Sequence, residues 1–177
     1  MLKTTQLVGH VASLRRYALL LTRDAESAEE LVQEALTRAI AAAGSFRPGA
    51  DARVWLFSIL HNVRMDDLRR SQTRARLSEA VALTRDETAL RDEALERVHL
   101  TQVLDAVSRL PETQRQAISL VALEDFSYVE AAAIMGTPVG TLMSRLGRGR
   151  EALRSMMAEE PQRRRANLHV VRSGGEA

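Results

Sequence analysis

The clearest structural signal in the sequence is the stretch Ser127-Tyr-Val-Glu-Ala-Ala-Ala-Ile-Met-Gly-Thr-Pro-Val-Gly-Thr-Leu-Met-Ser-Arg-Leu146. Ser127 and Glu130 have the spacing of a capping box, which predicts a short helix that starts at Ser127. Gly136 stands where a helix ends in the left-handed region, and the Thr-Pro pair at 137–138 fits the cap and first position of a second helix. The pattern predicts a helix-turn-helix, an arrangement that reads DNA.

The second helix of this motif has two different faces. Its apolar face is predicted from four residues at helical spacing, namely Val139, Leu142, Met143 and Leu146. A polar set follows two residues later, about 200° round the helix, and consists of Thr141, Ser144, Arg145 and Arg148. Arginines and hydroxyls on one face suit the base edges and phosphates of a major groove. The alternative for this helix alone is a solvated surface helix in a bundle.

The composition of the 177-residue chain favours an all-α fold. Ala, Leu, Arg and Glu are strong helix formers and dominate, whereas aromatic residues make up only 3%, which disfavours a β-sandwich or barrel. The chain has no Cys, and its four His are scattered, so we expect no disulfide, metal site or cofactor. No apolar run is long enough to cross a membrane, and no signal peptide opens the chain, so we expect a cytoplasmic protein.

Charges gather in separate blocks, although the net charge is only +2. An acidic block without an intervening cation contains Asp24, Glu26, Glu29, Glu30 and Glu34. One basic stretch contains Arg53, Arg64, Arg69, Arg70, Arg74 and Arg76, and a second contains Arg145, Arg148, Arg150 and Arg154. The overall Arg excess is also explained by a GC-rich genome, but its distribution suggests several polymer partners.

The pattern of apolar, polar and turn residues predicts two small helical domains. Helices are expected over about 8–21, 24–39, 52–70 or beyond, 98–110 and 111–123. The second is expected to start near Asp24 or Ser27, and Ser27 with Glu30 fits a capping box. The polar, mixed-charge segment 73–97 suggests a linker. The expected organisation is therefore a domain over 1–72, the linker, a domain over 98–158 and a disordered tail over 159–177.

The helix expected at 52–70 also carries two faces. Leu56, Ile59, Leu60 and Val63 form a predicted core stripe, and Ser58, Asn62, Met65 and Arg69 lie opposite. Trp55, Phe57 and His61 flank these faces. Aromatic rings beside Arg and Asn suit single-stranded nucleic acid, on which bases stack and phosphates pair. The alternative is that Trp55 and Phe57 belong to the core.

Three stretches in order resemble extracytoplasmic-function (ECF, group 4) RNA polymerase sigma factors of the sigma-70 family. Residues 24–34 resemble the polymerase-clamp-binding segment, and residues 46–70 resemble the segment that melts the promoter and reads the −10 element. Residues 110–115 and 127–150 resemble the −35-binding region. The resemblance covers about 7–155, and it implies a region 2 bundle over 1–72 and a region 4 helix-turn-helix over 98–158.

The resemblance implies an alternative sigma factor that binds core RNA polymerase and directs promoter-specific initiation in response to a stress or environmental signal. It implies duplex DNA at −35, single-stranded DNA at −10 and an anti-sigma factor as further partners, and no catalysis by the chain itself. The implied polymerase-binding residues are Asp24, Glu26, Glu29, Glu30, Leu31, Gln33 and Glu34. The implied −10 residues are Phe46, Arg47, Arg53, Trp55, Ser58, His61, Asn62, Arg69 and Arg70, and the implied −35 residues are Thr137, Thr141, Ser144, Arg145, Arg148 and Arg150.

Two features depart from the family pattern. Met143 stands where relatives often carry Arg, and Gly147 and Gly149 interrupt the −35 helix at about 1 kcal/mol each relative to Ala. Two other functions stay open: a helix-turn-helix regulator that never engages polymerase, and a sigma-like decoy that only binds an anti-sigma factor. We find no candidate catalytic site in the sequence.

Overall fold

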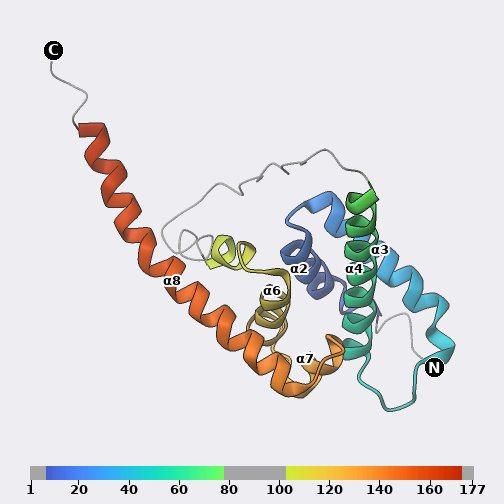
Figure 1. Cartoon of the computed structure of the whole chain (residues 1–177). Coiled ribbons are helices and arrows are strands. Elements are labelled where there is room, and N and C mark those ends of the chain that lie inside the picture. The colour runs from blue at the N-terminus through green and yellow to red at the C-terminus, as the bar shows by residue number, and fades with distance from the viewer. Residues whose placement is uncertain (1–6, 78–102, 173–177) are drawn as a thin grey trace.

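The computed structural model describes residues 7–77 and 103–172. Side chains are described for residues 7–73 and 103–158. These residues form helices and no strand, so the predicted all-α fold is confirmed. The first part contains α2 (Val11–Thr22), α3 (Ala25–Ala41), the 3-10 turn η1 (Ala43–Ser45) and α4 (Ala52–Leu77). The second contains a helical segment at 103–108, α6 (Glu112–Ile118), the π-helical turn η2 (Ser119–Leu123), α7 (Tyr128–Ile134) and α8 (Val139–Arg172) (Figure 1).

The first three long helices form a bundle, because each turns an apolar stripe inward. The stripe of α3 includes Ala28, Leu31, Val32 and Ala35, all buried. Asp24 caps this helix, since its carboxylate accepts from the Ser27 N–H at 2.7 Å. Of the two predicted starts, the one at Asp24 is confirmed and the Ser27–Glu30 cap is wrong, because Asp24 is the last extended residue and Ser27 already lies in the first turn.

The predicted helix-turn-helix is confirmed as α7 and α8. Ser127 and Glu130 exchange both hydrogen bonds of a capping box at the start of α7. Gly136 has a φ of 56°, the left-handed conformation expected for a helix-ending glycine. Helix α8 then begins at Val139, directly after Pro138.

Helix α8 extends much further than the sequence predicted. It runs through Pro161 to Arg172, whereas the sequence analysis expected a disordered tail from residue 159. The segment around residues 156–168 is rich in Met, Ala, Glu, Gln and Arg, which are good helix formers, and this favours continuation of α8. The predicted linker over 73–97 falls on the last turn of α4 and on residues 78–97, which lie outside the described part of the chain.

The first set of helices (α2, α3 and α4) and the second set (103–108, α6, η2, α7 and α8) pack against each other through one continuous core. Helix α7 lies against the first turns of α4, and α2 packs on both α6 and η2. Phe57 of α4 and Phe126, just before α7, meet with their ring centroids 4.9 Å apart. The start of α4, where the sequence places single-strand recognition, is therefore next to the helix-turn-helix.

Candidate nucleic-acid and protein interfaces

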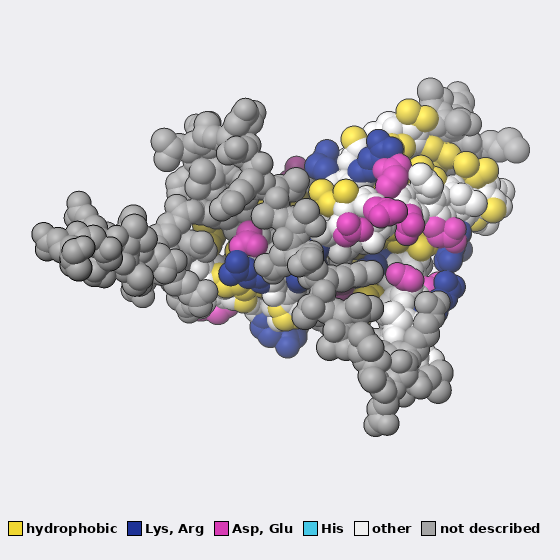
Figure 2. Space-filling model, turned by 90° about the horizontal axis from the view of Figure 1, so that it is seen from above, with side chains coloured by type: hydrophobic (Ala, Val, Ile, Leu, Met, Phe, Trp, Pro, Cys, Tyr) yellow, Lys and Arg dark blue, Asp and Glu magenta, His cyan; other side chains and the backbone are white. Residues whose placement is uncertain are grey.

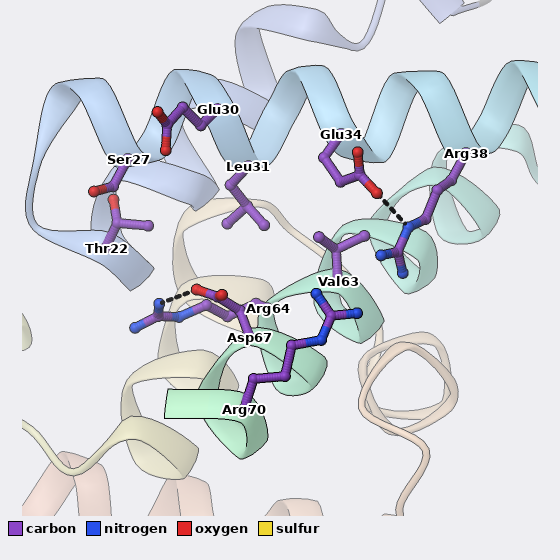
Figure 3. Close-up of a pocket in the computed structure, with 10 residues that line it drawn as sticks. All are labelled: Thr22, Ser27, Glu30, Leu31, Glu34, Arg38, Val63, Arg64, Asp67 and Arg70. Carbon is purple, nitrogen blue, oxygen red and sulfur yellow. Dashed lines mark hydrogen bonds and ion pairs between the residues drawn. The ribbon is translucent and has the colours of Figure 1, made fainter. Parts of the chain in front are cut away.

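The acidic residues of α3 form a surface beside a hollow between α3 and α4. Glu26, Glu30, Gln33 and Glu34 are exposed, and Figure 2 shows Asp and Glu side chains gathered on part of the face seen from above. The hollow has a volume of about 260 Å³ and is lined by three acidic and three basic side chains, together with neutral ones. Figure 3 shows Glu34 paired with Arg38 on the α3 side and Arg64 paired with Asp67 on the α4 side.

Besides Asp24 and Glu34, two further predicted α3 contact residues are already engaged within the fold. Leu31 is only 7% exposed and belongs chiefly to the bundle core, although one edge reaches the hollow. Glu29 pairs with Arg15 of α2 at 2.8 Å, and this hydrogen bond lowers the pKa of the Glu29 carboxyl. The exposed acids around them are the part of the surface that a basic partner can reach.

The loop before α4 brings aromatic and basic groups together. Phe46 and Trp55 stack edge to face with centroids 5.2 Å apart, and Trp55 is half-buried against the core. The Asp51 carboxylate accepts from the backbone N–H groups of Arg53 and Val54 at 2.7 and 3.2 Å, which orders the first turn of α4. Phe46 and Trp55 thus contact each other in an ordered loop and helix start, and both remain partly exposed at the surface.

The predicted −10 residues along α4 are divided between surface and interior. Arg47, Asn62, Arg69 and Arg70 are exposed, whereas Ser58 is half-buried and donates to the Val54 carbonyl. Phe57 is fully buried, so the alternative that it is a core residue is correct. Asn62, Arg69 and Arg70 lie along α4 and Arg47 lies in the loop before it, and an Asn among arginines suits both base-edge and phosphate contacts.

His61 differs from the other predicted −10 residues because it is buried. It is 4% exposed, and its Nδ1 has no hydrogen-bond partner. Burial lowers the pKa of His61 to about 4, with added effects from the positive charges of Arg145 and Arg69. In this arrangement His61 is neutral at pH 7, and its contact with −10 DNA stays a prediction.

The predicted −35 face of α8 is open along most of its length. Ser144, Arg148 and Arg150 are exposed, and Thr137, Thr141 and Arg145 are half-buried. Leu142 and Leu146 are buried as predicted, but Met143 is 52% exposed and Val139 is 37% exposed. The buried stripe of α8 instead continues through Gly149, so the helix is rotated relative to the predicted stripe.

Gly149 is explained by close packing rather than by helix weakening. A Cβ at this position would lie 3.1 Å from Cγ1 of Ile118 in α6, closer than ordinary contact. Gly147 has open space around it. The absent side chain at Gly149 therefore lets α8 approach α6, whereas Gly147 has no such role.

Known proteins match the chain in the same two parts. Family models for the Sigma2 domain of PhyR and for Sigma-70, region 4 match residues 7–61 and 100–153. The chain is 39% identical over 154 residues to the ECF RNA polymerase sigma factor EcfG of Rhodopseudomonas palustris (strain TIE-1), covering 85% of this chain and 82% of that protein. The chain belongs to the ECF RNA polymerase sigma factor family.

Other relatives and solved structures agree with this assignment. The ECF sigma factor SigC of Mycobacterium tuberculosis (strain CDC 1551 / Oshkosh) is 36% identical over 132 residues, with 73% of this chain and 70% of that protein covered. The fold is similar to the sigma factor RpoE from Bartonella quintana, with a TM-score of 0.71, 32% identity and coverage of 87% and 95% of the two chains. As an ECF sigma factor, the chain is a regulatory protein that directs core RNA polymerase to promoters.

The described residues add two further observations. None of their helices is long and apolar enough to span a bilayer. They contain no group of three or more His, Asp or Glu side chains placed to hold a metal ion.

Sequence reasoning missed the charged residues that join the two sets of helices. Glu124 is buried and pairs with Arg16 and Arg53. Arg115 is also buried and donates to the Leu21 carbonyl at 3.3 Å. A Glu that follows Leu-Val-Ala-Leu and precedes Asp-Phe looks like a loop residue, and no local pattern predicts partners 71 and 108 residues away.

Proposed function

We propose that this sigma factor uses three separate surfaces for initiation. The exposed acids of α3 bind core polymerase, the Phe46–Trp55 pair with Asn62, Arg69 and Arg70 binds unpaired −10 bases, and the polar face of α8 binds the duplex at −35. The observation that carries the proposal is the exposed polar face of α8, which follows a correctly capped α7 and turn.

The division of labour follows from the chemistry of each surface. Splaying bases out of the duplex costs a few kcal/mol per base, and stacking on aromatic rings offsets that cost. Exposed arginines on α8 supply phosphate contacts and guanine hydrogen bonds. Bond-forming chemistry is left to polymerase, and the site of action is then the cytoplasm, where polymerase works.

An anti-sigma factor is the proposed regulator of this chain, in response to a stress or environmental signal. The solved RpoE is in complex with the anti-sigma factor NepR, and the CnrH structure is in complex with the cytosolic domain of CnrY. CnrH has a TM-score of 0.64 and 25% identity, with coverage of 87% and 86% of the two chains. A protein that binds the acidic α3 surface or the basic α8 surface would block polymerase or DNA.

A sigma-like decoy is the second candidate, and one observation favours it. The first part of the chain matches the Sigma2 domain of PhyR, and a structure titled as an anti-anti-sigma factor PhyR complexed with NepR shares the fold at a TM-score of 0.56 and 19% identity. A decoy would bind the anti-sigma factor without directing initiation. The exposed DNA-facing arginines of α8 argue for the sigma role, since a decoy has no use for them.

Run-off transcription separates the two candidates. Core polymerase is mixed with the purified chain and a library of random DNA placed upstream of a reporter template, and the templates that yield transcripts are selected and sequenced. We expect these templates to share two upstream elements with a constant spacing. If core polymerase alone gives the same set, or the chain adds no start site, the sigma role is wrong and the decoy role is favoured.

A further inference from the structure

Glu124 is the most deeply buried carboxylate between the two sets of helices. Its side chain is 1% exposed and lies directly after η2. Arg16 of α2 donates Nε to Oε1 and Nη2 to Oε2, both at 3.2 Å. Arg53 of α4 donates Nη2 to Oε2 at 3.2 Å and also to the Glu124 backbone carbonyl. Glu124 of the second set thus forms ion pairs with two arginines of the first set.

The same contact occupies a residue assigned to −10 DNA. The Arg53 guanidinium lies 4.2 Å from the centroid of the Phe126 ring, and Phe126 stacks on Phe57. Arg53 therefore has its charge paired and its plane covered by the second set of helices. A phosphate would have to compete with these contacts for Arg53, whose side chain is 30% exposed.

A second group of contacts closes the interface on the α6 side. Arg115 of α6 and Arg64 of α4 both donate to the Leu21 carbonyl at the end of α2, at 3.3 and 3.2 Å. Glu112 pairs with Arg115 and faces Arg64 Nε at 3.7 Å. The interface is therefore polar and charged as well as apolar.

When such an interface opens, it exposes charged groups as well as apolar surface to water. On separation, Glu124, Arg16 and Arg53 all regain water, and Arg53 becomes available to an anionic partner. Glu124 is the buried member of this cluster, whereas the Arg16 and Arg53 side chains are 61% and 30% exposed, so loss of the Glu124 charge removes an attraction that holds the closed arrangement together. The closed arrangement thus depends on Glu124 as well as on the apolar contact between Phe57 and Phe126.

We propose that Glu124 latches a closed resting form, in which the second set of helices occupies Arg53 and covers the start of α4. The open form is the one that binds −10 DNA. The DNA-binding part of this inference rests on the proposed function of α4, whereas the latch itself does not.

Distances between spin labels test the latch without DNA or polymerase. The natural chain has no Cys, so Ala12→Cys on α2 and Ser155→Cys on α8, both at exposed positions, place the labels uniquely. In the full-length labelled chain we expect one narrow distance distribution. Glu124→Gln keeps the side-chain shape and removes the charge, and it should give a longer and broader distribution.

Asp105→Asn is the matched control for the charge change. Asp105 pairs with Arg109 within its own helix, and both are exposed, so this variant should keep the narrow distribution. A broad distribution in the parent chain, or an unchanged one in Glu124→Gln, overturns the proposal. Circular dichroism checks that helical content is retained. If Glu124→Gln loses helical content, Arg16→Gln is used in its place, because Arg16 is 61% exposed and its loss leaves Arg53 paired with Glu124. A partial lengthening of the label distance is then expected. An unchanged distance overturns the latch.

Binding of a fluorescein-labelled random single-stranded 20-mer tests the consequence. If the open form makes up about a tenth of the resting chain, full opening tightens the apparent Kd about tenfold. Glu124→Gln should show this gain, and Asp105→Asn should not. Longer label distances without tighter binding keep the latch but overturn its control of α4. Failure of run-off transcription with intact label distances would contradict only the proposed sigma role.

Discussion

His61 makes the stability of the closed form depend on pH. Its pKa is about 4 in the folded chain and about 6.5 when exposed, because burial disfavours the imidazolium. The unfolded chain therefore binds more protons between these values, so the His61 contribution to stability is complete above pH 6.5 and is lost as the pH falls to 4.

We expect a loss of about 3 kcal/mol in the free energy of unfolding from this one residue on acidification to pH 4. Urea unfolding of the parent and of His61→Gln at pH 7 and pH 4.5 measures it, because the carboxylates of both proteins titrate alike and cancel in the difference. The pH dependence should be smaller in the variant. Equal pH dependence in the two proteins would contradict the assignment.

Gly147 and Gly149 form a matched pair on one helix. Ala is favoured over Gly in a helix by about 1 kcal/mol, and the added methyl of Gly147→Ala meets open space, so this variant should be more stable by that amount. Gly149→Ala places its methyl against Ile118, itself buried, and overpacking of about 1–3 kcal/mol outweighs the gain. Thermal unfolding should show a higher Tm for the first variant and a lower one for the second. An equal rise in Tm for both variants would mean that Ile118 of α6 moves aside at little cost.

At the level of elements, the rotation of α8 can be tested with two adjacent residues. Leu142 is fully buried and Met143 is half-exposed, although the sequence pattern put both in the core. Leu142→Ala should cost about 2–5 kcal/mol of unfolding free energy, and Met143→Ala should cost less than about 0.5 kcal/mol. Chemical denaturation measures both. A loss of more than about 2 kcal/mol in unfolding free energy for Met143→Ala would mean that Met143 lies in the core, as the sequence predicted.

The exposed face of α8 predicts a specific salt effect. Arg148→Ala should weaken binding to duplex DNA carrying the selected −35 element, and it should reduce the slope of log K against log salt by about one. Arg154→Ala is the control, because it removes the same charge from the same helix but from a different face, where it pairs with Glu151. Fluorescence anisotropy over a salt series measures the slopes. The same change in both variants would indicate general charge attraction without a contact.

Helix ends were largely predictable because their signals are local. The Ser127–Glu130 box and the left-handed Gly136 depend on neighbours within a few residues, and both are confirmed. The start of α3 was predicted near Asp24 or Ser27, because two acceptable capping patterns overlap there and only the backbone angles of Asp24 decide between them. The rotation of α8 could not be predicted, because it depends on how closely Gly149 lets α6 approach.

For the molecule as a whole, the sequence predicted the candidate surfaces but not how they lie relative to one another. The acids of α3 and the arginines of α8 are exposed as expected, since long charged side chains rarely tolerate burial. Arg53 is partly covered because α7 packs on α4 and Glu124 pairs with Arg53, through contacts between residues far apart in the chain. No periodicity within one helix carries that information.

The separation of the surfaces makes a final prediction about partners. Glu30→Arg places a cation in the exposed acidic surface of α3, and like charges across an interface cost several kcal/mol, so affinity for core polymerase should fall at least about tenfold. Binding to duplex −35 DNA by the same full-length variant should be unchanged, because α8 is not involved. Asp105→Arg makes the same change of charge outside the α3 surface and controls for it. Surface plasmon resonance on immobilised core polymerase gives the affinities, and a similar loss for both variants would remove α3 from the polymerase interface.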